Sequence, residues 1–194
     1  MGSLPASGVL VVLSGPSGVG KTAISEKVIE RGNYVRAITA TTRSPRDGEQ
    51  DGVDYHFLSR EAFEERIGQG GFLEYAEVHG NLYGSPRADI EKQQQQAHAV
   101  LLLIDVQGAK TLREQDVDAL HVFLEPPGLE ELQRRLAGRG DETSEEMELR
   151  LENARAELEQ KNNYDHCVVN DDLEQAADRL VRILEEEWQR RVGQ

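Results

Sequence analysis

A glycine-rich octapeptide near the N-terminus constrains the fold of this chain more than any other feature. It follows the apolar, largely β-branched run from Val9 to Leu13, and it consists of Gly15, Pro16, Ser17, Gly18, Val19, Gly20, Lys21 and Thr22. The octapeptide matches G-x-x-x-x-G-K-[ST] at every fixed position. The pattern predicts a buried strand, a tight loop and a helix in this order.

The loop has the chemistry of a phosphate cradle. Its glycines allow backbone N–H groups to converge on phosphate oxygens at the N-terminus of a helix. Lys21 then reaches the β- and γ-phosphates, and the Thr22 hydroxyl is the expected Mg²⁺ ligand. The pattern predicts a nucleoside triphosphate with Mg²⁺ as its companion, but it does not identify the reaction that follows.

Buried strands alternate with helices along the rest of the chain. This alternation predicts an α/β fold with a parallel sheet that is covered by helices on both faces. The expected core strands are residues 9–14, 35–39, 100–106, 121–124 and 167–170, and shorter strands are expected at 55–58 and 72–79. The expected helices are 22–30, one after Ser59, one with Ser85 as its cap and Pro86 as its first residue, one opened by the capping box from Thr143 to Glu146, and one from Leu173 to Trp188.

Composition excludes several classes of protein. The formal charge of −14 argues against binding to nucleic acid polymers, whose phosphates require a basic surface. No apolar run approaches the roughly 20 residues needed to span a bilayer, so we expect no membrane span and a cytoplasmic location. Cys167 is the single cysteine, which fits a reducing compartment, and its apolar neighbours predict a buried thiol. The five histidines are not spaced as a metal site.

Three classes of phosphate-loop protein compete at this point. A GTPase requires D-x-x-G, which Asp105 to Gly108 satisfies, and N-K-x-D, which the chain lacks. A motor or transporter ATPase usually needs more chain for its coupling elements. A small-molecule kinase needs a second anion site, and Arg43 and Arg46 on a proline-stiffened loop can fork onto one phosphate. A solvated surface is the alternative interpretation of this arginine pair.

Five segments in a fixed order resemble the guanylate kinase family, and the match runs from about Gly8 to Asp172. The phosphate loop alone is common to many families, whereas the second and third segments together are specific to this one. The segments are Ser14 to Thr22; Thr41 to Arg46 with Gly52 to Phe57; Phe72 to Ala76 with Gly80 to Ser85; Ile104 to Ala109; and Gly138 to Gly140 followed by Val169 to Asp172.

The resemblance implies an acceptor site for GMP. It assigns the GMP phosphate to two arginines and two tyrosines, and the guanine to a carboxylate and two hydroxyl side chains. An ionised Glu74 can accept hydrogen bonds from guanine N1–H and from the exocyclic amine together, and adenine offers no such pair of donors. The implied GMP-binding residues are Thr39, Arg43, Arg46, Tyr55, Glu74, Tyr83, Ser85 and Asp105.

The resemblance also implies an ATP site with a mobile lid. Lid arginines that close over ATP would neutralise charge on the transferred phosphoryl group and exclude water. The implied ATP-binding residues are 15–22 with Arg135, Arg139, Asn170 and Asp171, while Arg134 is expected on the helix surface. The implied catalytic residues are Lys21, Arg43, Arg139, Arg150 and Asp105, with Thr22 at the metal.

The function that the resemblance implies is ATP-dependent phosphorylation of GMP, and of dGMP, in purine nucleotide metabolism. The alternatives are a noncatalytic guanylate-kinase-like module that binds a phosphopeptide, and a kinase for another phosphorylated acceptor. The family usually carries an acid at the position of Leu103, so its role is vacant or taken over here. The implied single domain has a core of residues 8–38, 98–134 and 164–194, a GMP-binding part of 39–90 and a lid of 135–160.

These assignments divide the net charge of the chain between a basic site and an acidic remainder. Six basic residues are expected at phosphates, and without them the rest of the chain carries −20. The sequence therefore predicts a small positive cleft within a strongly acidic shell. It leaves open whether the protein is a monomer or a homo-oligomer. The six residues are Lys21, Arg43, Arg46, Arg135, Arg139 and Arg150.

Overall fold

The centre of the molecule is a five-stranded parallel sheet with the strand order β2-β7-β1-β8-β9. The computed structural model describes residues 7–78, 80–137 and 144–193. Every residue of the middle strand is buried, as expected for a parallel sheet covered on both faces. The strands are β1 (Val9–Ser14), β2 (Tyr34–Arg36), β7 (Ala99–Leu103), β8 (Leu120–Glu125) and β9 (His166–Val169).

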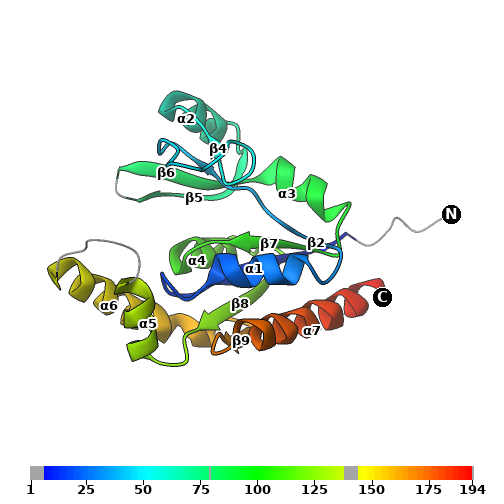
Figure 1. Cartoon of the computed structure of the whole chain (residues 1–194). Coiled ribbons are helices and arrows are strands. Elements are labelled where there is room, and N and C mark those ends of the chain that lie inside the picture. The colour runs from blue at the N-terminus through cyan, green and yellow to red at the C-terminus, as the bar shows by residue number, and fades with distance from the viewer. Residues whose placement is uncertain (1–6, 79, 138–143, 194) are drawn as a thin grey trace.

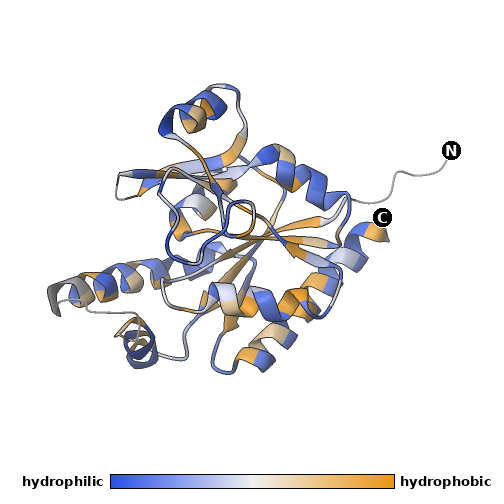
Figure 2. Ribbon diagram, turned by 45° about the horizontal axis from the view of Figure 1, so that its top comes forward, coloured by the Kyte–Doolittle hydropathy of each residue, from blue (hydrophilic) through white to orange (hydrophobic). Residues whose placement is uncertain are grey.

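Two helices cover each face of this sheet (Figure 1). Alternate residues of β1 point to opposite faces. Val9, Val11 and Leu13 pack against α1 and α7, whereas Leu10 and Val12 pack against α3 and α4. Figure 2 shows the result as apolar strands enclosed by helices with hydrophilic outer faces. The four helices are α1 (Lys21–Ile29), α3 (Arg87–Gln94), α4 (Val106–Glu114) and α7 (Leu173–Val192).

A second sheet, of four short strands, forms the upper part of the molecule in Figure 1. Its order is β4-β3-β6-β5, and β5 and β6 form an antiparallel pair. The helix α2 (Arg60–Gly68) packs on it through Phe63, whose ring stacks on Phe72 at 4.3 Å between centroids. The strands are β3 (Ala40–Thr41), β4 (His56–Phe57), β5 (Phe72–Val78) and β6 (Asn81–Pro86).

A third group of helices lies at the lower left of Figure 1. It comprises α5 (Leu129–Ala137), α6 (Ser144–Glu159) and the 3-10 turn η1 (Gln160–Asn163). Leu132 and Leu136 of α5 form a small core with Ala154 of α6, and Met147 and Leu151 pack against it. The predicted apolar stripe of α6 is therefore confirmed at these positions, while Thr143 of its predicted capping box lies outside the described residues.

The predicted α/β fold with a parallel sheet is confirmed, but two boundaries next to the site are wrong. Ser85 and Pro86 end β6 instead of opening a helix, and α3 begins at Arg87. The Ser85 hydroxyl is not a helix cap because it donates a hydrogen bond to Glu74. β7 ends at Leu103, since the Asp105 side chain already caps α4 by accepting from the Gly108 N–H at 2.8 Å.

Two further expectations fail at the sheet edges. The strand expected at 35–39 ends at Arg36, because the chain then crosses to the second sheet. Cys167 is exposed instead of buried, since β9 is an edge strand in which only Val168 is buried. Within the described ranges, no helix combines the length and the apolar character that crossing a membrane requires.

The packing of α7 on β1 generates a stability prediction. Leu180 is fully buried in the core that joins α7 to the sheet. We expect Leu180→Ala to lower the free energy of unfolding by about 2–5 kcal/mol, because it removes buried apolar contacts and leaves a cavity. Urea denaturation measures this difference, and Glu186→Ala on the exposed side of α7 is the matched control, expected within about 0.5 kcal/mol of the wild type. Equal losses in both variants would contradict the assigned packing.

Candidate active site

The glycine-rich loop between β1 and α1 is shaped by backbone conformations that favour glycine. Gly15, Gly18 and Gly20 have φ angles of 140°, 79° and 101°. A Cβ at Gly15 would lie 2.4 Å from the carbonyl oxygen of Leu124, and a Cβ at Gly20 would lie 2.5 Å from Asn170 Nδ2. The loop therefore tolerates no side chain at these positions.

A groove of about 380 Å³ lies along this loop. Lys21 turns back over it, and its Nζ donates to the carbonyl oxygens of Gly15 at 2.6 Å and Pro16 at 3.1 Å. Thr22 is exposed in the first turn of α1, where its hydroxyl can meet a metal ion held by phosphates. The groove is lined by Ser17, Gly18, Gly20, Lys21, Thr22, Ala23 and Glu26.

Arg135 and Asn170 meet at the carbonyl oxygen of Val19 in this loop. The guanidinium of Arg135 donates to Val19 O at 3.2 Å and to Asn170 O at 3.0 Å, while Asn170 Nδ2 donates to Val19 O at 2.8 Å. Glu131 holds Arg135 from the other side at 2.9 Å, and this ion pair lowers the pKa of the Glu131 carboxyl. The structure thus brings two sequence-predicted ATP residues to the loop.

The other predicted ATP and lid residues beyond the loop are an exposed aspartate, an exposed arginine and an arginine outside the described residues. Asp171 follows Asn170 but is exposed and pairs with Arg179 at 2.5 Å. Arg150 is exposed on α6, and Arg139 lies outside the described residues. Arg134 is 76% exposed, as expected for the helix surface.

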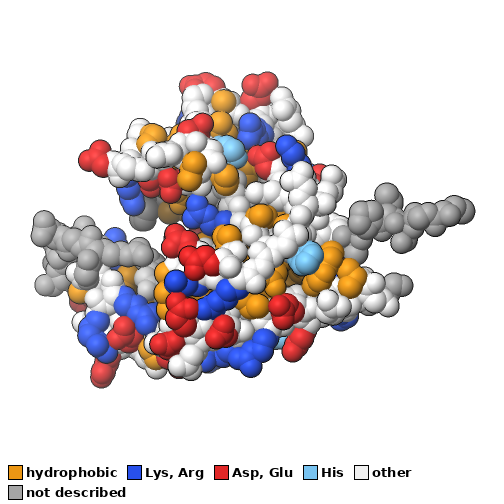
Figure 3. All heavy atoms as spheres, turned by 45° about the vertical axis from the view of Figure 1, so that its right-hand side comes forward, with side chains coloured by type: hydrophobic (Ala, Val, Ile, Leu, Met, Phe, Trp, Pro, Cys, Tyr) orange, Lys and Arg blue, Asp and Glu red, His pale blue; other side chains and the backbone are white. Residues whose placement is uncertain are grey.

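A second cavity, of about 210 Å³, lies between the two sheets. Thr39, Tyr55, Glu74, Tyr83 and Asp105 line it, so five of the eight residues predicted for GMP share one cavity. Ala76, Val78, Gly84, Leu103 and Ile104 complete its wall. Figure 3 shows basic and acidic side chains next to one another at the hollow between the upper part of the molecule and the rest.

Glu74 is the buried acid of this cavity. It is only 6% exposed, and the hydroxyl of Ser85 donates to its Oε1. A Cβ at Gly108 would lie 3.1 Å from Glu74 Oε2, so the glycine leaves room for the carboxylate at the start of α4. Burial raises the pKa of Glu74 to about 7, against the hydrogen bond from Ser85, and the charge of Asp105 adds to the rise. This carboxyl is poised between its two charge states at neutral pH.

Arg43 lies beside the cavity among two aromatic rings and a carboxylate. Its guanidinium is 5.5 Å from the Tyr55 ring centroid and 5.9 Å from that of Phe57, and it donates to both oxygens of Glu49 at 2.9 Å. Burial opposes its charge, but hydrogen bonds with Glu49 and Tyr83 raise the pKa of Arg43 overall. The guanidinium is therefore held in place beside the two predicted phosphate-binding tyrosines.

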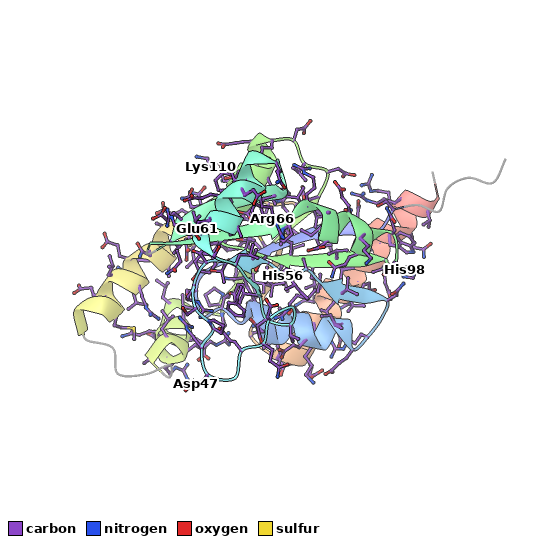
Figure 4. All side chains as sticks on the ribbon, turned by 90° about the horizontal axis from the view of Figure 1, so that it is seen from above. Asp47, His56, Glu61, Arg66, His98 and Lys110 are labelled. Carbon is purple, nitrogen blue, oxygen red and sulfur yellow. The ribbon has the colours of Figure 1, made fainter. Side chains whose placement is uncertain are left out.

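Arg46 stands apart from this group. It is exposed on the loop that follows β3, and its backbone N–H donates to Glu49 at 2.8 Å. Asp47 projects at the outer tip of the same loop (Figure 4). Both arginines of the expected pair are thus on the loop, and Arg43 is the one of the two whose guanidinium lies beside Tyr55 of the cavity wall.

Two acidic residues at the site were missed by sequence reasoning. Glu49 lies within the loop segment that carries the two arginines, and its spacing of six residues from Arg43 gave no signal of their contact. Glu157 of α6 lies within electrostatic range of Lys21 and Asp105, and burial raises the pKa of its carboxyl. Only the docking of α6 brings Glu157 into this range.

The described residues contain no cluster of three or more His, Cys, Asp or Glu side chains suited to a metal ion. His56 and His98 lie on different parts of the molecule (Figure 4). His56 faces Asp89 at 3.4 Å, and His98 stacks on Trp188 at 4.6 Å between ring centroids. These histidines make packing and surface contacts.

Comparisons with known proteins agree on one family. The model of the family described as guanylate kinase matches residues 7–187. Guanylate kinases from two strains of Clostridium perfringens, strain 13 and strain SM101, are each 44% identical over 178 residues, which cover 91% of this chain and 82% of the relative.

Solved structures give the same picture. The guanylate kinase from Anaplasma phagocytophilum superimposes with a TM-score of 0.75 at 36% identity, covering 96% of this chain and 89% of the other. The shikimate kinase from Bacteroides thetaiotaomicron is similar in fold alone, with a TM-score of 0.52 at 19% identity, covering 91% of this chain and 98% of the other.

The buried carboxyl generates a prediction for stability against pH. Because its pKa rises from 4.5 to about 7 on folding, the protonated Glu74 stabilises the fold below about pH 4.5, and this contribution is lost as pH rises through 7. Glu74→Gln does not titrate, so we expect the stability of the variant relative to the wild type to rise by about 3 kcal/mol between pH 4.5 and pH 8. Chemical denaturation at both pH values measures this change.

Glu91→Gln, an exposed change on α3, is the control for this measurement. Its stability relative to the wild type should stay constant across the same range. A constant difference for Glu74→Gln as well would contradict the raised pKa.

Proposed function

The chain belongs to the guanylate kinase family, and on that premise we propose that it transfers the γ-phosphoryl group of ATP to GMP, and to dGMP, giving ADP and the diphosphate. It is a nucleoside monophosphate kinase by family. One observation carries the choice of acceptor: a buried carboxylate, Glu74, lines a cavity whose wall also contains Asp105 from the edge of the central sheet. A carboxylate in this position can read a base that carries two adjacent N–H donors.

The acceptor base is proposed to bind at Glu74. In its ionised form the carboxylate accepts from N1–H and the exocyclic amine of guanine. Ser85 donates to Oε1 and fixes the plane of the carboxylate, while Thr39 contributes a hydroxyl to the cavity wall. An adenine presents an N1 acceptor where guanine presents N1–H, so it would leave one carboxylate oxygen without a donor, which costs more than a merely missing contact.

The acceptor phosphate is proposed to bind at Arg43, Tyr55 and Tyr83. The two phenol rings meet edge to face at 6.2 Å between centroids, and the guanidinium lies beside them. A charged guanidinium and two phenolic hydroxyls supply the donors that a phosphate monoester requires. Arg46 reaches the same phosphate only if its exposed side chain swings inward.

ATP is proposed to bind along the glycine-rich loop. Backbone N–H groups of residues 15–22, apart from that of Pro16, which has none, surround the phosphates, and Lys21 exchanges its carbonyl partners for phosphate oxygens. The exposed Thr22 hydroxyl suits Mg²⁺, which prefers one or two protein oxygens together with phosphates and water. Mg²⁺ would supply charge neutralisation on the triphosphate. Asn170, Asp171 and Arg135 are proposed at the nucleoside end of ATP.

The reaction is proposed to be a direct in-line transfer without a covalent enzyme intermediate. The acceptor phosphate is itself an adequate nucleophile, so positioning and charge neutralisation provide most of the catalysis. Lys21, Arg43 and Asp105 fix the reactants, and Arg139 and Arg150 of the lid complete the charge neutralisation when they close over ATP. Closure also excludes water, which would otherwise hydrolyse ATP.

The proposal divides the chain into three working parts. The core comprises residues 8–38, 98–134 and 164–194, the acceptor part comprises 39–90, and the lid comprises 135–160. The second sheet and α2 support the acceptor part, and the small core between α5 and α6 supports the lid. An exposed free thiol at Cys167 is consistent with a cytoplasmic location.

An assay of ADP release tests the function. We expect turnover with GMP and dGMP, and at least about a hundredfold lower kcat/KM with AMP, CMP and UMP, because these bases lack the paired donors that Glu74 accepts. Turnover that favours another acceptor would contradict the assigned substrate. Absence of turnover with every nucleotide, together with phosphopeptide binding, would contradict an enzymatic function.

Two substitutions separate the donor site from the acceptor site. Lys21→Ala is expected to lower kcat by at least about a hundredfold while the Kd for GMP stays within twofold of wild type, since Lys21 contacts only the donor phosphates. Arg43→Ala is expected to raise the Kd for GMP by about ten- to a hundredfold, since it removes a charge-assisted contact. Calorimetry with GMP and steady-state kinetics measure both effects.

Lys110→Ala and Arg134→Ala, both exposed and outside the two cavities, are the matched controls and should behave as wild type (Figure 4 labels Lys110). Equal loss of GMP affinity in Lys21→Ala and Arg43→Ala would contradict the division of the site.

A further inference from the structure

The loop that carries the two arginines of the acceptor part is closed by one carboxylate. Both Oε atoms of Glu49 accept hydrogen bonds from Nη2 of Arg43 at 2.9 Å. Glu49 Oε2 also accepts from the backbone N–H of Arg46 at 2.8 Å, and the backbone N–H of Glu49 donates to the carbonyl oxygen of Arg46 at 3.0 Å. Glu49 therefore holds the side chain of the first arginine and the backbone of the second.

The start of this loop is joined to β6, the strand that carries Tyr83. The backbone N–H of Thr42 donates to Leu82 O at 3.0 Å, and the backbone N–H of Leu82 donates to Thr42 Oγ1 at 2.9 Å. Arg43 is the next residue, so β6 sets the position of its backbone. The long side chain of Arg43 depends on further contacts for its direction.

The guanidinium of Arg43 obtains these contacts from the loop and from two rings. Its Nη1 donates to the carbonyl oxygen of Ser44 at 2.7 Å, and Glu49 takes Nη2. The rings of Tyr55 and Phe57 lie on either count within 6 Å of the guanidinium carbon, at 5.5 and 5.9 Å. None of these hydrogen bonds uses Nε–H, which they leave for a further acceptor. Glu49 is the charged group among these contacts.

Glu49 can affect a nearby phosphate in two opposite ways. The backbone N–H of Arg46 and then the guanidinium of Arg43 hold the pKa of the Glu49 carboxyl below its ordinary value, against the opposing effect of burial, so the carboxylate is ionised at neutral pH. An ionised carboxylate repels a phosphate, but its charge is already compensated by these two donors. A guanidinium that is already held also loses little rotamer freedom when the phosphate binds. The compensated charge makes the second effect the larger one.

We propose that Glu49 is a positioning residue of the acceptor site, which holds the guanidinium of Arg43 where the phosphate of the acceptor nucleotide binds. This inference rests on the proposed function of Arg43 as a phosphate-binding residue. Glu49 itself acts through Arg43 and does not bind the nucleotide. Its loss frees the guanidinium to leave the two rings, which lowers the affinity for GMP and leaves the ATP groove unaffected.

Glu49→Gln tests the proposal because the variant keeps the size of the side chain but has one acceptor oxygen and no charge. GMP is titrated by calorimetry into the full chain, and the KM for ATP is measured by steady-state kinetics. We expect the Kd for GMP to rise about five- to twentyfold, because the charge-assisted contact that orients Arg43 is lost. The KM for ATP is expected to stay within twofold of wild type.

Asp47→Asn is the matched control. Asp47 is exposed at the outer tip of the same loop, two residues from Glu49, and its substitution removes the same charge without removing a contact to Arg43 (Figure 4). The Kd for GMP should stay within twofold of wild type in this variant. A rise equal to that of Glu49→Gln would contradict a specific role of Glu49.

A double substitution shows whether Glu49 acts through Arg43. In the Arg43→Ala protein, Glu49→Gln is expected to cause no further loss of GMP affinity, because there is no guanidinium left to hold. A merely structural role of Glu49 in the loop would give a further loss of the same size as in the wild type, since independent effects add. That result would overturn the proposal.

An unchanged or lower Kd for GMP in Glu49→Gln would also overturn it, and a lower value would mean that Glu49 competes with the phosphate. If Glu49→Gln lowers the Tm by more than about 5 °C, Glu49→Ala is measured in its place under the same criteria. Failure of the proposed function appears separately, as a wild type that does not bind GMP or binds it equally well after Arg43→Ala, and it overturns this inference too. A wild type that binds GMP through Arg43 but is matched by Glu49→Gln overturns this inference alone.

Discussion

The parallel pairing of β1 with β7 on one side and β8 on the other is the constraint on which the site depends. Parallel strands bring their carboxyl ends to one edge of the sheet. The glycine-rich loop leaves β1 at this edge, Asp105 follows β7, and Asn170 follows β9. Residues that are far apart in the sequence therefore meet within hydrogen-bonding distance, as when Asn170 donates to Val19 O.

The acceptor side depends on a second constraint, the burial of one carboxylate. Glu74 is stabilised by the Ser85 hydroxyl and by the space left at Gly108, yet burial still raises its pKa to about 7. Burying an ionised carboxylate is unfavourable unless hydrogen-bond donors surround it, and acids with raised pKa values are typical of functional sites. A substrate that brings N–H donors to Glu74 would offset this unfavourable burial. We propose that the base of GMP supplies these donors, which connects the energetics of the cavity to the proposed choice of substrate.

Sequence patterns predicted the sheet and the phosphate loop well, because a fully buried strand and a glycine-rich loop leave local signals. Sequence patterns gave wrong predictions for residues whose environment depends on contacts between distant elements. Ser85 looks like a helix cap in the sequence, but the buried Glu74 takes its hydroxyl, and Cys167 looks buried, but β9 is an edge strand. The contact of Glu49 with Arg43 depends on loop folding, and the position of Glu157 near Lys21 and Asp105 depends on helix docking. The sequence has no periodic signature for either.

The central claim is that Glu74 accepts two hydrogen bonds from guanine next to the phosphate-transfer site. Inosine monophosphate has N1–H but lacks the exocyclic amine, so the ratio of kcat/KM for GMP over inosine monophosphate measures the second hydrogen bond alone. The account predicts a ratio of at least about ten in the wild type, because a hydrogen bond to a buried charge contributes about 1.5–3 kcal/mol. Equal kcat/KM values for the two nucleotides would contradict it.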